Sequence, residues 1–235
     1  MTPKNKRQFR ILDTATQRAA LRRSFWTALT VMVALSLTAA APAQRTILFL
    51  GDSITAGYGL ELAQAFPALI EQRIRQNNWK FKVVNAGQSG DTSAGGLNRM
   101  EWLLKNRVDV LVLELGANDG LRGLPVEVTR KNLQAIIERA RKLYPQIKIV
   151  IAGMKVPPNM GVQYSRDFEA MFVDLAKKNN ASLIPFILEG VGGVRKLNLP
   201  DGIHPTAKGH EIVAQTVWKV LEPLLRSLEP AASPG

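Results

Sequence analysis

A serine, an aspartate and a histidine in this chain have the residue types and the local context of a hydrolytic site. Ser53 directly follows an apolar run, in the sequence GDSIT. Asp201 stands three residues before His204, so one turn of chain can bring its carboxylate to the imidazole ring. A serine hydroxyl needs an adjacent base to become a nucleophile, and a carboxylate fixes the tautomer of that base. We predict that Ser53, His204 and Asp201 form a catalytic triad for acyl transfer.

Acyl transfer also needs hydrogen-bond donors for the negative charge that develops on the carbonyl oxygen. The candidates are the backbone N–H groups of Ser53 and Gly90 and the side-chain amide of Asn118. Glycine at position 90 lets the backbone approach a substrate without an intervening side chain. Each of these residues alone would also fit a turn or a helix cap. Their occurrence together favours an oxyanion hole.

Other polar residues near these segments are expected to have structural roles. Five of them are predicted to serve turns or caps: Asp52, Ser89, Asp91, Ser93 and Asp119. Among these, Asp119 is expected to fix the loop around Asn118. His210 lies in the pattern of the last helix, and we expect it to be a solvated surface residue.

Five apolar stretches alternate with helical patterns and must position these residues. Strands are expected over residues 46–50, 81–84, 108–115, 147–152 and 182–186. Several of these runs are continuous, which is typical of parallel strands covered on both faces. The alternation predicts an α/β fold with a five-stranded, doubly wound parallel sheet, in a three-layer α/β/α, flavodoxin-like arrangement. Ligands bind beyond the carboxyl ends of such strands, where the candidate residues stand.

The first 43 residues have the composition of an export signal. They hold seven Lys or Arg and one Asp, followed by an uncharged, largely apolar stretch that ends in Ala41-Pro42-Ala43. This pattern is typical of a secretory signal peptide. We predict a cleaved signal peptide over residues 1–43, a hydrolase domain over 44–227, a flexible tail over 228–235, and export to the periplasm or beyond. An uncleaved membrane anchor is the alternative, because the uncharged stretch is long enough to span a bilayer.

The net charge of +12 over 235 residues divides into +6 on residues 1–43 and +6 on the remainder. The remaining Lys and Arg are scattered and match no nucleic-acid-binding signature, so we expect no nucleic-acid partner. The chain has no Cys and only two His. This composition excludes disulfides and thiolate metal sites, and it disfavours a metal held by several histidines. We expect neither a metal nor a cofactor.

At these residues the chain resembles the GDSL or SGNH hydrolase superfamily. The four family blocks correspond to residues 51–54, the Gly90 segment, residues 116–119 and residues 201–204. The match is closest to the bacterial group of thioesterase I, protease I, lysophospholipase L1 and arylesterase, and it extends over residues 46–225. The chain departs from the usual blocks at Ile54, where Leu is usual, and at Ala117, where many members have Gly. Neither change removes a functional group.

The resemblance implies a cofactor-free serine hydrolase of carboxylic esters and thioesters, with Ser53, Gly90, Asn118 and His204 in the four family roles and Asp201 completing the triad. It places the substrate-gating loops at residues 120–125 and 156–164. The residues expected to line an acyl groove there are Gly120, Leu121, Pro125, Pro157, Met160 and Tyr164. We expect a small-molecule acyl ester or thioester as substrate, transient contact with a lipid surface, and a monomer.

Three other functions fit less well. A carbohydrate O-acetylesterase on the same fold is the alternative enzyme, and the thioesterase-like motifs disfavour it. An α/β-hydrolase would carry G-x-S-x-G around its serine, whereas Ser53 stands in GDSIT. A non-catalytic binding protein on this scaffold would not need a complete set of catalytic groups.

Overall fold

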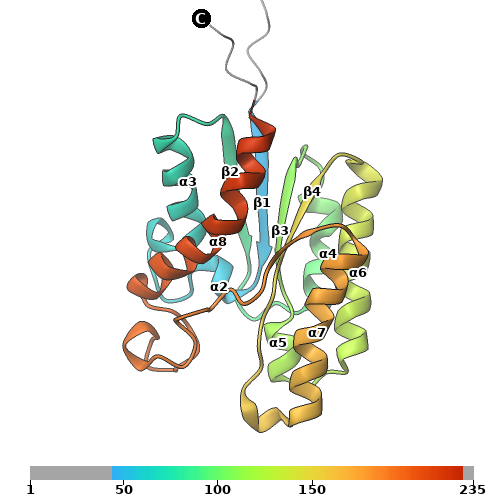
Figure 1. The fold of residues 1–235 in the computed structure, drawn as a ribbon, viewed down its shortest axis with the longest axis vertical. Helices are drawn as coiled ribbons and strands as arrows, with labels where there is room; N and C mark the ends of the chain where they lie inside the picture. The colour runs from blue at the N-terminus through green and yellow to red at the C-terminus, as the bar shows by residue number, and fades with distance from the viewer. Residues whose placement is uncertain (1–43, 230–235) are drawn as a thin grey trace, which may run out of the picture. The chain divides into compact units, whose positions relative to one another are not determined.

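A sheet of five parallel strands runs through the centre of the computed structural model, which describes residues 44–229 (Figure 1). The strands are β1 Arg45–Gly51, β2 Phe81–Gly87, β3 Val110–Glu114, β4 Lys148–Ala152 and β5 Ser182–Ile184. Their order is β2-β1-β3-β4-β5, and every neighbouring pair is parallel. This is the flavodoxin-like order, so the predicted fold class is confirmed.

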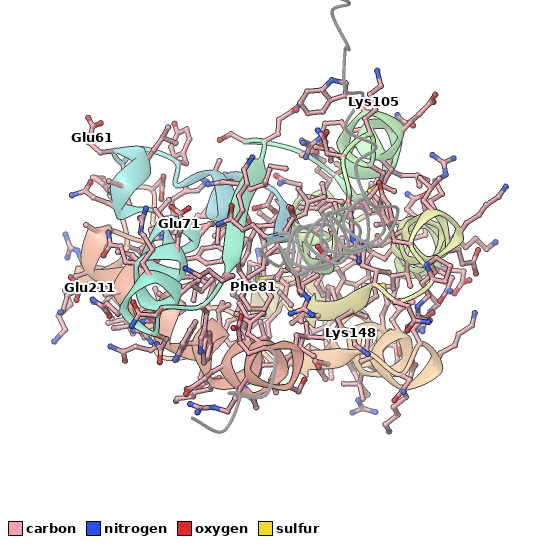
Figure 2. The ribbon with its side chains drawn as sticks, turned by 90° about the horizontal axis from the view of Figure 1, so that it is seen from above. Glu61, Glu71, Phe81, Lys105, Lys148 and Glu211 are labelled. Carbon is pink, nitrogen blue, oxygen red and sulfur yellow. The ribbon has the colours of Figure 1, made fainter. Side chains whose placement is uncertain are left out.

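Helices cover both faces of the sheet. On one side α3 (Phe66–Gln76) packs against α8 (Ala207–Leu228), and on the other α6 (Val126–Leu143) packs between α4 (Ser93–Leu103) and α7 (Val162–Lys178). Figure 2 views the molecule from the end at which β2 and β4 begin, marked by Phe81 and Lys148. The opposite end carries the residues that follow the strands.

The central strands of the sheet are buried on both faces, which explains their uninterrupted apolar runs. Every residue of β3 is buried, and β1 is buried from Ile47 onward. Phe49 of β1 packs edge to face against Phe66 of α3, with ring centroids 5.5 Å apart. In the helical layer that includes α7, Phe168 and Phe172 pack in the same way at 5.3 Å. The first contact joins α3 to the sheet, and the second lies within the buried face of α7.

Strand pairing brings the ends of β1, β2 and β3 together. Gly51 pairs in register with Gly87 on one side and with Glu114 on the other. This pairing extends β2 beyond its predicted end at residue 84. By contrast, β5 stops at Ile184, since the next residue, Pro185, has no N–H to donate to a ladder. The segments that follow β1, β2 and β3 therefore begin side by side.

The prediction that His210 is a solvated surface residue is wrong. His210 is 1% exposed on α8, and its Nδ1 accepts the backbone N–H of Phe66 at 3.1 Å. The ring also stacks on the Phe66 ring, with centroids 6.2 Å apart. His210 thus caps the first residue of α3 and joins the two helices on this face. Burial, with a smaller effect of the His204 charge, lowers the pKa of His210 to about 4, so the ring is neutral.

The C-terminal helix reaches further than predicted. α8 continues through Leu228, and the Glu229 carboxylate accepts the backbone N–H of Lys80 at 3.3 Å. These two residues of the predicted tail are therefore attached to the domain, whereas residues 230–235 and the predicted signal peptide lie outside the described residues. Within residues 44–229, no helix is both long enough and apolar enough to cross a membrane.

Candidate active site

Ser53 begins α2 (Ser53–Ala56), a single helical turn that directly follows β1. Asp52 is the N-cap of this turn, and its Oδ1 accepts the Ile54 N–H at 3.0 Å. The predicted capping role of Asp52 is therefore confirmed. Because β1 lies between β2 and β3, the turn places Ser53 where the strand order reverses, which is the ligand-binding position in folds of this kind.

Ser53, His204 and Asp201 form a continuous chain of hydrogen bonds. His204 Nε2 lies 2.9 Å from Ser53 Oγ, and His204 Nδ1 lies 2.8 Å from Asp201 Oδ2. When Nδ1–H donates to the carboxylate, Nε2 is left free to accept the serine proton. The short spacing of Asp201 and His204 predicted their contact, and the position of Ser53 after a strand and the family resemblance added the nucleophile; the fold brings the three side chains together.

The loop before α8 fixes Asp201 in its orientation. Asp201 Oδ1 accepts the backbone N–H groups of Ile203 and His204 at 2.8 and 3.0 Å, while Oδ2 faces the imidazole ring. The two backbone hydrogen bonds, the one from His204 first, together with the imidazole contact, hold the pKa of Asp201 at about 2. The carboxylate is therefore ionised at neutral pH and can stabilise an imidazolium ion.

Tyr58 contacts the imidazole of His204 from outside the triad. The ring centroids are 4.4 Å apart with an interplanar angle of 37°, and Tyr58 is 50% exposed. Tyr58 lies just beyond α2, so the segment that carries the nucleophile also supports the base. No role for Tyr58 was predicted from the sequence, since the contact depends on how the loops fold over one another.

The candidate oxyanion donors lie along the same edge of the sheet. Gly90 has a φ of 79°, a conformation that residues with a side chain rarely adopt. Within residues 44–229, the backbone N–H groups of Gly90 and Ser53 donate no hydrogen bond, so both are available to a substrate. The amide nitrogen of Asn118, on α5 (Ala117–Leu121), donates to the Asp91 carbonyl at 2.9 Å and to the Asp52 carboxylate at 3.3 Å. Asn118 is thus held between the neighbours of Ser53 and Gly90.

Arg99 fixes the loop that carries Gly90, a role that was not predicted from the sequence. Its guanidinium donates to the Asp91 carboxylate at 2.6 and 3.0 Å and to the Ala86 carbonyl at 3.0 Å. Arg99 therefore joins the end of β2 to the residue whose carbonyl accepts from Asn118. The available signal in the sequence was an arginine eight residues after Asp91, which could form an ion pair with it.

Asp119 fixes the loop around Asn118 through its buried carboxylate, as predicted. It is fully buried and accepts the backbone N–H of Ser93 at 2.8 Å as well as the Ser93 hydroxyl. The Thr129 hydroxyl donates to it at 3.3 Å from α6. One carboxylate thus ties α5 to both α4 and α6, and Ser93 serves the start of α4 rather than catalysis.

Two buried acids lie directly behind Ser53. Burial raises the pKa of Asp52 to about 6, although the Ile54 N–H opposes this rise. Burial, and then the neighbouring Asp52 charge, raises the pKa of Glu114 well above its ordinary range. Residues 44–229 contain no group of three His, Cys, Asp or Glu side chains that could hold a metal ion.

The two predicted substrate loops, residues 120–125 and 156–164, contact each other. The Tyr164 hydroxyl donates to the Leu124 carbonyl at 2.7 Å, and Met160 lies against Gly123. Three of the predicted lining residues are exposed: Leu121, Pro125 and Pro157. Met160 and Tyr164 are half-buried.

Gly120 is the exception among the predicted lining residues. A Cβ at this position would lie 2.5 Å from Val156 and 2.9 Å from Phe168, so the residue is covered by these side chains. Gly120 therefore allows the two loops to pack and, being buried, offers little surface to a ligand. Its prediction as a substrate contact is wrong for this reason.

Comparison with known proteins places the chain among ester and thioester hydrolases. It matches the model of the GDSL-like Lipase/Acylhydrolase family over residues 49–212. It is 40% identical over 194 residues to Esterase TesA of Pseudomonas aeruginosa, and this alignment covers 82% of this chain and 96% of that protein. It is 37% identical over 190 residues to Thioesterase 1/protease 1/lysophospholipase L1 of Escherichia coli, which covers 80% of this chain and 89% of that protein.

A solved structure extends the comparison to the fold. Psychrotrophic esterase EstA from Pseudoalteromonas sp., inhibited by monoethylphosphonate, superposes with a TM-score of 0.73 at 31% identity, covering 77% of this chain and 99% of that one. The family match spans most of the chain and includes all five residues of the candidate triad and oxyanion hole. The chain therefore belongs to the GDSL-like lipase/acylhydrolase family.

Proposed function

We propose that this protein hydrolyses carboxylic esters and thioesters through an acyl-enzyme on Ser53. The observation that carries the proposal is the hydrogen-bonded chain from Ser53 Oγ to His204 and from His204 to Asp201, at 2.9 and 2.8 Å. Family membership and the names of the relatives support the same class of reaction. Neither a metal nor a cofactor is needed for it.

The first half of the reaction forms the acyl-enzyme. Ser53 Oγ attacks the carbonyl carbon while its proton passes to His204 Nε2, and Asp201 stabilises the imidazolium ion. The tetrahedral intermediate collapses by breaking the bond from carbon to the leaving oxygen or sulfur. His204 gives the proton to that atom, so the alcohol or thiol leaves neutral.

The second half repeats the sequence with water as the nucleophile. His204 takes a proton from the water, which attacks the acyl carbon, and the carboxylic acid leaves as Ser53 regains its proton. In both halves the oxyanion would accept from the N–H groups of Ser53 and Gly90 and from the Asn118 amide. For this, one Asn118 amide hydrogen must turn from Asp52, its longer contact at 3.3 Å, toward the substrate.

The exposed side chains near the candidate site support binding of an apolar acyl group of the substrate. Exposed apolar side chains gather on the segments that follow the strands: Tyr58, Leu62, Leu121, Val162 and Ile203. These side chains would also contact a lipid surface transiently. We assign residues 1–43 to a cleaved export signal, residues 44–227 to the hydrolase domain, with α8 extending it to Leu228, and the protein to the periplasm or the exterior as a monomer.

A substrate panel tests the proposal. The purified protein is assayed on p-nitrophenyl acetate, p-nitrophenyl octanoate, an acyl thioester and an acetylated sugar, with and without a chelator. The proposal predicts hydrolysis of the aryl esters and of the thioester, unchanged by the chelator. Activity confined to the acetylated sugar would instead assign the protein to the carbohydrate O-acetylesterases, and no turnover of any ester would leave a binding protein.

A further inference from the structure

Glu114 is a buried acid that no step of the proposed reaction uses. It is the last residue of β3, is 2% exposed, and pairs in register with Gly51 at the end of β1. Burying a carboxyl group costs free energy unless hydrogen bonds replace those made by water. The partners of Glu114 therefore indicate what the residue does.

Those partners flank the nucleophile. Glu114 Oε2 accepts the Thr55 hydroxyl at 2.7 Å and the Asp52 backbone N–H at 3.3 Å. Thr55 and Asp52 are themselves 0% and 1% exposed. A Cβ at Gly51 would lie 2.0 Å from Thr55 Oγ1 and 2.5 Å from Glu114 Oε2, so only glycine leaves room for this contact. One carboxyl group thus holds both sides of the turn that carries Ser53.

The same carboxyl group also reaches the oxyanion side of the site. Asp52 donates its backbone N–H to Glu114, and the carboxylate of the same Asp52 accepts from the Asn118 amide at 3.3 Å. Two neighbouring buried carboxyl groups cannot both be ionised without a large cost in free energy. Asp91 and His204 are the other ionisable groups whose charges act on Asp52. Burial, and then the Asp52 charge, raises the pKa of Glu114 well above its ordinary range, so Glu114 is the neutral member of the pair.

We propose that Glu114 is a positioning residue for acyl transfer: it holds Ser53 through its hydrogen bonds to Thr55 and Asp52, and it holds the Asn118 amide through Asp52. It is not a catalytic residue, because it touches no reacting atom. The proposal rests on the proposed function, since it concerns the same site. It assigns the buried end of β3 a role in the rate of the reaction as well as in folding.

The test compares three purified variants with the wild type. Glu114→Leu removes the hydrogen bonds at similar volume, whereas Glu114→Gln keeps a neutral group that can both donate and accept. Asn179→Ala is the matched control: Asn179 is buried at the end of α7, and its amide donates to Gln134 at 2.8 Å and to the Leu175 carbonyl at 2.9 Å. Each variant is measured for kcat and KM on p-nitrophenyl butyrate, for the rate of inactivation by a phosphonate ester, and for Tm.

Glu114→Leu is expected to lower kcat and the inactivation rate by about tenfold to a hundredfold, with KM within about twofold, because a small displacement of a reacting group has an effect of this size. Glu114→Gln should recover most of that loss. Asn179→Ala should lower Tm while both rates of the folded protein stay within about twofold of the wild type. If the leucine variant does not fold, Thr55→Val gives the same comparison with one hydrogen bond removed.

Wild-type rates in Glu114→Leu, or in Thr55→Val if that replaces it, would overturn the positioning role, and so would an equal loss in Glu114→Gln and Glu114→Leu. An Asn179→Ala variant as impaired in kcat as Glu114→Leu would also overturn it, since the loss would then follow stability. These results are distinct from failure of the proposed function, which is an inactive wild type.

Discussion

His204 Nε2 lies 2.9 Å from Ser53 Oγ, although 151 residues separate the two along the chain. The parallel sheet creates this contact, because Ser53 follows the end of β1 and His204 lies in the loop before α8, which packs against α3. The partners are already hydrogen-bonded without a substrate. Loss of one group is therefore expected to lower kcat more than it changes KM, as for interactions made chiefly in the transition state.

Asp201→Asn is expected to lower kcat/KM by about 10²–10⁴-fold, because an amide neither balances the imidazolium charge nor fixes the required tautomer. The measurement is the steady-state hydrolysis of p-nitrophenyl butyrate. The control is Asp167→Asn, which alters an exposed aspartate on α7, away from the triad; its kcat/KM should match that of the wild type. Equal activity of Asp201→Asn and Asp167→Asn would contradict the assignment of Asp201.

Asn118→Ala is expected to reduce kcat by about 10²–10³-fold with little change in KM, the usual effect of removing one oxyanion donor. Stopped-flow or steady-state assays on the same ester measure it. Asn98→Ala, on the exposed face of α4, is the control. A change confined to KM would mean that Asn118 binds the substrate in its ground state instead.

His210 is expected to make the protein less stable in mild acid. Its pKa is about 4 in the folded state and 6.5 ordinarily. Between these values His210 binds a proton in the unfolded chain but not in the native protein. The contribution of neutral His210 to the free energy of unfolding is therefore complete above pH 6.5 and is lost as pH falls toward 4. The loss amounts to roughly 3 kcal/mol.

Urea unfolding at pH 7, 6, 5 and 4 tests this for the wild type and for His210→Asn, which keeps an acceptor near the Phe66 N–H. Other titrating groups contribute to both proteins, so the difference between their pH profiles isolates His210. The asparagine variant should lose less free energy of unfolding between pH 6.5 and 4. Parallel profiles would show that His210 does not titrate on unfolding.

The tilted ring contact of Tyr58 with His204 is expected to help orient the imidazole. Tyr58→Ala should lower kcat by about two- to tenfold, the equivalent of the 0.5–1.5 kcal/mol typical of an aromatic pair. Tyr58→Phe keeps the ring and should retain the wild-type rate. If the alanine and phenylalanine variants have equal kcat values, the ring contact does not contribute to the reaction.

Much of the fold and the central part of the site could be predicted from the sequence because the informative residues are local. Continuous apolar runs such as that of β3 indicate strands buried on both faces, and the positions of Ser53 and Asn118 just beyond strands place them at one edge. The spacing of Asp201 and His204 is likewise a local signal. Gly90 and Asn118 were candidate donors from their positions after strands, and the family resemblance supported both roles.

The residues that were missed or misplaced depend on contacts between distant segments. His210 lies three residues before Val213 and so on the same helical face, a signal that its polarity obscured. Glu114 is read as the end of an apolar strand, and only pairing with β1 brings it behind Ser53. Gly120 is covered by Val156 and Phe168, which belong to elements far along the chain.

The most direct test of the acyl-enzyme mechanism is the rate of p-nitrophenyl ester hydrolysis by Ser53→Ala. Ser53 is buried and its hydroxyl oxygen contacts the base, so the variant removes the nucleophile with little effect on the fold. We predict that kcat falls by more than about 10³-fold, as for other serine hydrolases that lose the nucleophile. Hydrolysis at the wild-type rate would contradict the mechanism.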